Sequence, residues 1–319
     1  MSKPLDEALI DAGRAAPAIQ GGRDLAGRGG LRRVVITGAG TINALGHDVA
    51  STMQAFRDGR CGITQLEFRD VDRLSIQIGA QVHDWTPETY FNRQQILLYD
   101  KFTQFTLLAA KQAVEQAGLH FQGALGLRSG VVLGTAGGGL NTWDENYRAV
   151  YEEGKNRVHP FVVPKLMNNA AASHVSMEFG LRGPAFTVAT ACASSNHAMG
   201  LAFQMVRSGA ADVMLSGGSE AMLCFGGVKA WEGLRVMSPD GCRPFDARRN
   251  GMVMGEGAAV FVLEAPLVPI AEQDNRITNT PMPAAPRSWP RSWGSPCRLM
   301  RRTSSCRPPR GPSARSLAR

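Results

Sequence analysis

The order of apolar runs and amphipathic segments along the chain predicts an α/β fold with a mostly parallel sheet. Short apolar, β-branched runs are expected to form buried strands at 34–37, 131–133, 186–190, 212–216 and 257–264, with a weaker candidate near 74–80. Helical spacing of apolar residues occupies the intervening segments 48–58, 100–117, 164–179 and the stretch after residue 192. Strands that alternate with helices in this way are typical of βαβ units.

The segment 100–117 carries the clearest signals of a helix and of its two ends. Asp100 is suited to cap its N-terminus, and Gly118 is suited to end it. The segment 164–179 is expected to form one helix, with Asn168 and Asn169 inside it.

A single cysteine lies where a predicted strand meets a predicted helix. Cys192 follows the apolar run 186–190 within a series of small residues, and a helical pattern follows at Ala198, Leu201, Ala202 and Met205. The positive end of the helix dipole and the unpaired N–H groups of the first turn favour negative charge on the sulfur. This placement makes Cys192 a candidate nucleophile. The alternative is a buried structural cysteine.

Two glycine-rich segments suggest close backbone approach. Gly38 and Gly40 end the first strand, but the full G-x-G-x-x-G pattern of a dinucleotide-binding fold is absent because Asn43 occupies the last position. Residues 134–139 (GTAGGG) indicate a ligand contact or a tight turn. They do not form a phosphate-binding P-loop, since Leu140 and Asn141 follow in place of GK[ST].

The formal charge of +8 arises at one end of the chain. Residues 275–319 hold ten of the 35 basic residues and no acid, so the remainder nearly balances the 27 acidic residues and gives no support for nucleic-acid binding. No apolar run is long enough to span a membrane, and the N-terminus lacks the apolar segment of a signal peptide. The six cysteines show neither a CxxC pair nor metal-ligand spacing, so a reduced, cytoplasmic setting without a metal is expected.

Several sequence blocks together resemble the β-ketoacyl-ACP synthases of the KAS I/II type, which have the thiolase fold. The active-site signature matches at 183–199, and further matches are VVITGAG at 34–40, GTAGGG at 134–139, NNAAASHVSMEFGLRGP at 168–184, SGGSEA at 216–221 and RPFDARRNGMVMGEGAAVFVLE at 243–264. Within the family the chain is most similar to the chain-elongating synthase II group, which includes nodulation-type synthases.

The resemblance implies a thiolase-like fold of two similar βαβαβαββ halves, of which residues 31–265 correspond to the N-terminal half. Residues 1–30 are then an extension of low order, and residues 266–319 are an Arg- and Pro-rich tail expected to be disordered. With suitably chosen codons, residues 287–305 read in another frame give ILAEVVGFAMSADASDIV, which resembles the start of the family's second half. We therefore hypothesise a frameshift between residues 264 and 287; the alternative is a genuine basic tail for an acidic partner.

The resemblance also implies a mechanism. Cys192 accepts an acyl group from acyl-ACP, and the carbanion from decarboxylation of malonyl-ACP then attacks the thioester. The family takes two histidines, a lysine and one oxyanion donor from its second half, so this chain is expected to be condensation-deficient. Acyl carrier protein is the implied partner, homodimerisation through 186–190 is implied, and no cofactor is implied.

The remaining polar candidates are expected to be structural. None of the six histidines is assigned a catalytic role; His197, five residues after Cys192, is expected to point away from it on the helix. Glu220 and Glu256 are expected to be buried, hydrogen-bonded carboxylates. Gly137–Gly139 are expected to shape the acyl-chain pocket or only a turn. Two alternatives to a condensing enzyme stay open: a non-catalytic, dimerising interaction protein, and another thiolase-fold acyltransferase.

Overall fold

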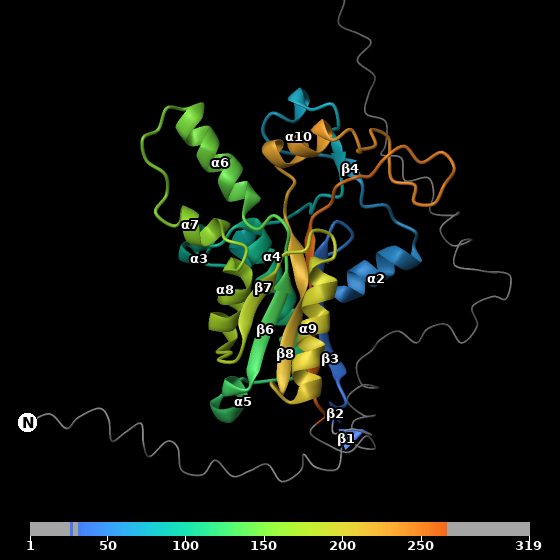
Figure 1. Ribbon diagram of the computed structural model, residues 1–319. Coiled ribbons are helices and arrows are strands. Elements are labelled where there is room, and N and C mark those ends of the chain that lie inside the picture. Colours follow the sequence, from blue (N-terminus) through green and yellow to red (C-terminus); the bar gives the residue numbers. More distant parts are fainter. Residues whose placement is uncertain (1–25, 28–30, 267–319) are drawn as a thin grey trace, which may run out of the picture.

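The computed structural model describes residues 26–27 and 31–266, which are built around one five-stranded sheet (Figure 1). The strand order is β3-β9-β8-β6-β7. The strands span Val35–Asn43 (β3), Gly257–Glu264 (β9), Val213–Glu220 (β8), Ser129–Gly134 (β6) and Ala185–Val188 (β7). Only β9 runs antiparallel to its neighbours, so four of the five strands share one direction. The predicted α/β fold with a mostly parallel sheet is confirmed.

Helices cover both faces of this sheet (Figure 1). Of the helices, α4 and α8 lie on one face and α9 lies on the other. The helices span Val49–Arg57 (α2), Arg93–Leu98 (α3), Lys101–Ala117 (α4), Gly123–Leu127 (α5), Leu140–Tyr151 (α6), Val162–Leu166 (α7), Ala170–Phe179 (α8), Ser194–Ser208 (α9) and Phe225–Gly233 (α10). Two 3₁₀ turns lie at Val71–Arg73 and Pro87–Thr89.

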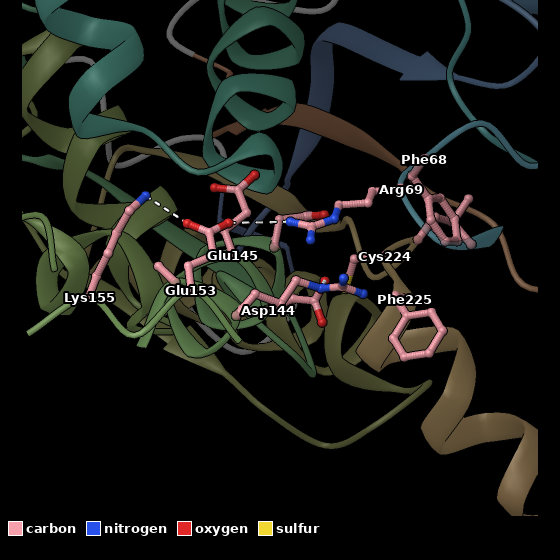
Figure 2. Close-up of a pocket in the computed structure, with 12 residues that line it drawn as sticks. Phe68, Arg69, Asp144, Glu145, Glu153, Lys155, Cys224 and Phe225 are labelled. Atoms are coloured by element: carbon pink, nitrogen blue, oxygen red, sulfur yellow. Dashed lines mark hydrogen bonds and ion pairs between the residues drawn. The ribbon is translucent and has the colours of Figure 1, made fainter. Parts of the chain in front are cut away.

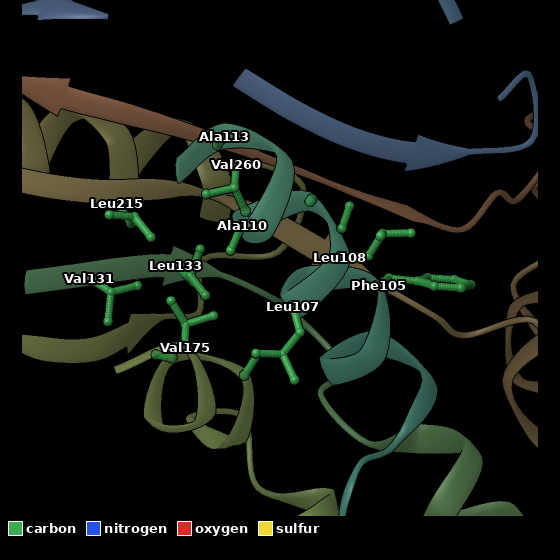
Figure 3. Close-up of a cluster of buried hydrophobic side chains, with 14 of the residues drawn as sticks. Phe105, Leu107, Leu108, Ala110, Ala113, Val131, Leu133, Val175, Leu215 and Val260 are labelled. Carbon is green, nitrogen blue, oxygen red and sulfur yellow. The ribbon is translucent and has the colours of Figure 1, made fainter. Parts of the chain in front are cut away.

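The core follows from alternation along the strands. Val131 and Leu133 of β6 point into the cluster under α4 and α8, whereas Val132 between them points into the cluster under α9. Figure 3 shows the first cluster, in which side chains of α4 meet those of the central strands. A strand buried on both faces reads as a continuous apolar run, which is why these strands are visible in the sequence.

Helix α4 begins and ends as its sequence predicts. The Asp100 side chain accepts a hydrogen bond from the N–H of Phe102, and Gly118 ends the helix in the left-handed conformation. The other carboxylate oxygen of Asp100 accepts from both the N–H and the hydroxyl of Thr142, at 2.8 and 2.6 Å. The capping residue of α4 therefore also anchors the start of α6.

Gly38 and Gly40 serve the packing of α4 on the edge strand β3. A Cβ at Gly38 would overlap the carbonyl oxygen of Ala113, and one at Gly40 would overlap that of Ala109. The close backbone approach at both glycines is therefore to α4. The side chain of Gln112 in α4 also accepts a hydrogen bond from the N–H of Thr41, at 2.9 Å, and so satisfies a donor of this sheet edge.

One of the predicted elements is confirmed only in part, and one is wrong. The short strand predicted near 74–80 is present as β5 (Ile78–Gly79), but it pairs with β4 (Thr64–Gln65) in a two-stranded sheet apart from the central one. The predicted helix 164–179 is two helices, α7 and α8, because the N–H of Gly139 takes the carbonyl of Leu166 and the chain is extended at Met167. The helix predicted after residue 192 is confirmed as α9; its buried face holds Ala198, Ala202 and Val206, and Leu201 is exposed.

Both ends of the chain fall largely outside this description. A short antiparallel pair, β1 (Ala26–Gly27) and β2 (Leu31–Arg32), precedes β3. The rest of the expected N-terminal extension and the tail from residue 267 lie outside the described residues.

Candidate active site

Cys192 lies in an exposed turn between β7 and the 15-residue helix α9, as the sequence predicts. The preceding residue, Ala191, has a left-handed backbone with φ of 51°. A non-glycine residue in this region stores about 1–3 kcal/mol, which the surrounding contacts must offset. Because β6, β7 and β8 are parallel, their carboxyl ends meet at the sheet edge from which this turn emerges. The nucleophile candidate is therefore held on a strained turn at a helix N-terminus.

The buried side chain of Ser194 holds this turn from inside. Its Oγ accepts from the N–H of Thr190 at 2.9 Å and donates to the carbonyl oxygen of Ala191 at 2.6 Å. The N–H of Ser194 also donates to that same oxygen, at 3.0 Å. Two hydrogen bonds of the Ser194 side chain and one of its backbone N–H thus fix the conformation of Ala191.

Two glycines of the central strands seat the start of α9 on the sheet. A Cβ at Gly134 would overlap the backbone of Ser194 and Ser195, and one at Gly218 would lie 2.7 Å from the Cβ of Ser195. The absence of side chains here lets the helix N-terminus and Cys192 sit directly at the ends of β6 and β8. The sequence indicates close backbone approach for the segment that includes Gly134, but it gives no sign that the start of α9 is the neighbour.

The glycine-rich loop 134–139 closes around Glu220. The carboxylate of Glu220 accepts hydrogen bonds from the N–H groups of Ala136 and Gly137, at 2.8 and 3.1 Å, and from the hydroxyl of Thr135, at 3.2 Å. A Cβ at Gly139 would lie 2.5 Å from backbone atoms of α7. The close approach made at Gly139 is therefore to another part of the chain, and Glu220 is the hydrogen-bonded structural carboxylate that the sequence predicts.

The ionisation of Glu220 is expected to make stability depend on pH. Burial raises the pKa of Glu220 above its ordinary value of 4.5, against the effect of its three hydrogen bonds. The folded state therefore binds the Glu220 proton more tightly than the unfolded state does. The stabilisation of the fold by this protonated carboxyl is complete below pH 4.5 and is lost as the pH rises through the raised pKa. A glutamine at this position cannot ionise, so the Glu220→Gln variant should lose less of its free energy of unfolding as the pH rises. Urea unfolding across the pH range measures this loss. Glu115→Gln, on the exposed side of α4, is the matched control, and an unchanged decline in Glu220→Gln would contradict the assignment.

Glu256 is the second buried carboxylate predicted to be structural, and its contacts agree. Its Oε1 accepts from the Lys101 ammonium at 2.6 Å and from the N–H of Val82 at 3.0 Å, and its side chain is fully buried. This ion pair ties the start of α4 to the residue before β9.

The six histidines of the chain all lie within the described residues, and no hydrogen bond there joins a histidine to the Cys192 sulfur. His174 packs its ring on Tyr99 with centroids 4.5 Å apart, and burial lowers the pKa of this imidazole. His159 is exposed in a loop, as expected. His197 makes a contact that the sequence did not predict, since its Nδ1 lies 2.8 Å from the hydroxyl oxygen of Thr190.

A separate cavity of about 320 Å³ lies between α6 and α10 (Figure 2). Its charged lining residues have both signs and include Asp144, Glu145, Arg148 and Lys155. The buried thiol of Cys224 also lines it, and burial raises the pKa of this thiol to about 11. Cys224 is therefore protonated at neutral pH, unlike the thiol that a nucleophile requires.

Neither a metal site nor a membrane helix is evident in the part of the chain that the structure describes. Within residues 31–266, no three His, Cys, Asp or Glu side chains gather as metal ligands would. No helix in this part is both long and apolar enough to cross a bilayer.

Comparisons with known proteins point to one family. The family described as "Beta-ketoacyl synthase, N-terminal domain" matches residues 31–266. Nodulation protein E of Rhizobium sp. (strain N33) is 44% identical over 234 residues, which cover 73% of this chain and 58% of that protein. The 3-oxoacyl-[acyl-carrier-protein] synthase 2 of Staphylococcus aureus (strain N315) is 34% identical over 239 residues, with the same two coverages.

Among solved structures, a type II polyketide synthase acyl-carrier protein in complex with its ketosynthase (AntDE:AntF) matches with a TM-score of 0.63 and 26% identity. The match covers 77% of this chain and 60% of that one. The chain belongs to the β-ketoacyl synthase family, a family of thiolase-fold condensing enzymes, and it contains that family's N-terminal domain. It spans 58% of the length of the curated relatives that it matches.

Proposed function

We propose that this chain is a 3-oxoacyl-ACP synthase II-like acyltransferase of fatty-acid or related synthesis, in which Cys192 accepts the acyl group. The observation that carries the proposal is the placement of Cys192, exposed on a strained turn at the N-terminus of α9. The family membership and the names of the relatives support it. The helix N-terminus offers N–H groups and a positive field to the thiolate and to the oxyanion that forms after attack.

In the proposed step, the Cys192 thiolate attacks the thioester carbonyl of acyl-ACP. The tetrahedral intermediate collapses, the bond to the carrier thiol breaks, and the proton given up by Cys192 ends on that thiol. The products are an acyl-cysteine thioester and free carrier. The backbone N–H of Cys192 is one of the two donors that the family resemblance assigns to the oxyanion.

We propose further that the 319-residue chain loads the acyl group but does not make the carbon–carbon bond. In the family the enolate of malonyl-ACP is stabilised by two histidines from the second half. All six histidines here lie in the N-terminal half. His174 contacts the ring of Tyr99 and His197 contacts the hydroxyl of Thr190, and we assign neither of them to the enolate. The sequence of residues 267–319 contains no histidine.

The proposed partners are acyl carrier protein and a second copy of this chain, in the cytoplasm. The structural neighbour solved with an acyl-carrier protein supports the first. Strand β7 supports the second, because within the described sheet it pairs only with β6 and leaves its other edge open. The same open edge also favours the alternative function, a non-catalytic protein that only dimerises.

Acyl loading followed by mass spectrometry separates the two functions. The purified chain, incubated with acyl-ACP of several chain lengths, is expected to gain one acyl mass, and peptide mapping is expected to place it on Cys192 as a thioester. Adding malonyl-ACP is expected to yield no β-ketoacyl-ACP. A folded chain that gains no acyl group from any donor would favour the non-catalytic alternative. Measurable β-ketoacyl-ACP would overturn the proposed loss of condensation.

A further inference from the structure

We propose that Thr190 and His197 form a positioning pair that holds Cys192 at the helix N-terminus. The Nδ1 of His197 lies 2.8 Å from the Oγ1 of Thr190. Thr190 stands two residues before Cys192, and His197 is the fourth residue of α9. The hydrogen bond therefore links the two sides of the turn that contains Cys192.

The contact completes a clamp of which Ser194 is the other half. Ser194 is buried and fixes the backbone of Thr190 and Ala191 from inside the turn. The Thr190 and His197 side chains close the same turn on its exposed side. Since Ala191 has a left-handed backbone that an L-residue disfavours, a turn clamped on one side only would relax toward commoner conformations. Relaxation would change the position of the Cys192 sulfur relative to the N–H groups of the first helical turn.

The chemistry of the two groups suits a permanent contact. A threonine hydroxyl both donates and accepts, so it pairs with Nδ1 whether or not that nitrogen carries a proton. Among the hydrogen bonds recorded for residues 31–266, His197 is the sole partner of the Thr190 hydroxyl. Because both side chains are exposed, their hydrogen bond contributes little to global stability, and its larger effect is on the turn itself.

The inference rests on the proposed function only in taking Cys192 as the nucleophile, and its test does not require acyl transfer. Iodoacetamide is applied to the 319-residue protein, and the alkylation rate of the Cys192 peptide is followed by mass spectrometry. His197→Ala and Thr190→Val are each expected to slow it by about two- to tenfold, the effect of one hydrogen bond. The double variant is expected to lose no more than either single variant, because both remove the same contact.

Conservative variants distinguish positioning from a general loss of structure. His197→Asn keeps a polar atom near the Nδ1 position and Thr190→Ser keeps the hydroxyl, so both are expected to restore most of the rate. Asn196→Ala, a neighbouring exposed position on the same helix, is the matched control and should leave the rate unchanged. Unchanged rates in His197→Ala and Thr190→Val would overturn the proposal. Fully additive losses in the double variant, or an equal loss in Asn196→Ala, would overturn it as well.

The acyl-loading assay gives a second readout. In His197→Ala, the first-order loading rate is expected to fall while the half-saturating acyl-ACP concentration stays the same, since the pair orients the thiol and does not touch the carrier. Failure of the unsubstituted chain to load would overturn the proposed function alone, and the alkylation rates would still decide the role of Thr190 and His197.

Discussion

Replacing Cys192 by alanine is expected to abolish acyl loading, and replacing it by serine should lower the loading rate on the order of 10³-fold or more. A serine hydroxyl occupies the same place but stays protonated at neutral pH, so the helix N-terminus has no anion to stabilise. Both substitutions are small and lie in an exposed turn, so the fold is expected to persist. Intact-protein mass spectrometry after incubation with acyl-ACP measures the loss directly.

The other described free thiols provide the controls for this experiment. Cys242→Ser changes a partly exposed cysteine outside the Cys192 turn and should leave loading intact. Cys224 is buried, and its raised pKa of about 11 keeps it protonated, so it should carry no acyl group. Acyl mass that persists in Cys192→Ala and maps to another cysteine would contradict the assignment of the nucleophile.

The location of the candidate site could be predicted from the sequence, but the hydrogen bonds and the backbone conformation that hold Cys192 in place could not. An apolar run, one cysteine and a helical pattern place Cys192 at a strand–helix junction because each signal is local. The helix rule of 100° per residue predicts that His197 points away from Cys192, but it gives no sign of the contact between His197 and Thr190. The rule does not apply to Thr190, since that residue precedes the helix and its direction is set by the left-handed Ala191. A conformation of this kind in a non-glycine residue leaves no mark in composition or spacing.

The same division between local and long-range signals explains the helices. Helix α4 ends where predicted because Asp100 and Gly118 act on their own neighbours. The predicted helix 164–179 is interrupted because Gly139, distant in sequence, bonds the carbonyl of Leu166. The helix propensity of residues 164–179 gives no sign of this hydrogen bond, because its donor lies outside the segment. Gly38 and Gly40 likewise suggest close backbone approach, and only the position of α4 shows which backbone approaches them.

The second large effect is expected at Gly40, the glycine of β3 that lies against α4. Gly40→Ala is expected to lower the free energy of unfolding by about 3 kcal/mol or more, at the upper end of overpacking costs. The added methyl group would overlap the carbonyl oxygen of Ala109 and approach the Cβ of Gln112 at 2.8 Å. Backbone of a buried helix cannot rotate aside as a side chain can, so α4 must shift. That shift would also weaken the hydrogen bond from the Thr41 N–H to Gln112.

A matched glycine elsewhere in the chain should respond with the opposite sign. Gly200 lies within α9, and a Cβ there would meet no atom within 4 Å. Gly200→Ala is therefore expected to raise the free energy of unfolding by about 0.5–1 kcal/mol, because alanine loses less backbone entropy in a helix. Urea unfolding followed by circular dichroism measures both variants under the same conditions. A change of less than about 0.5 kcal/mol in Gly40→Ala, the range of neutral surface substitutions, would show that α4 does not pack against β3 as closely as the structure has it. The two variants together thus test whether Gly40 is required for the packing of α4 on β3, as distinct from the binding of a ligand.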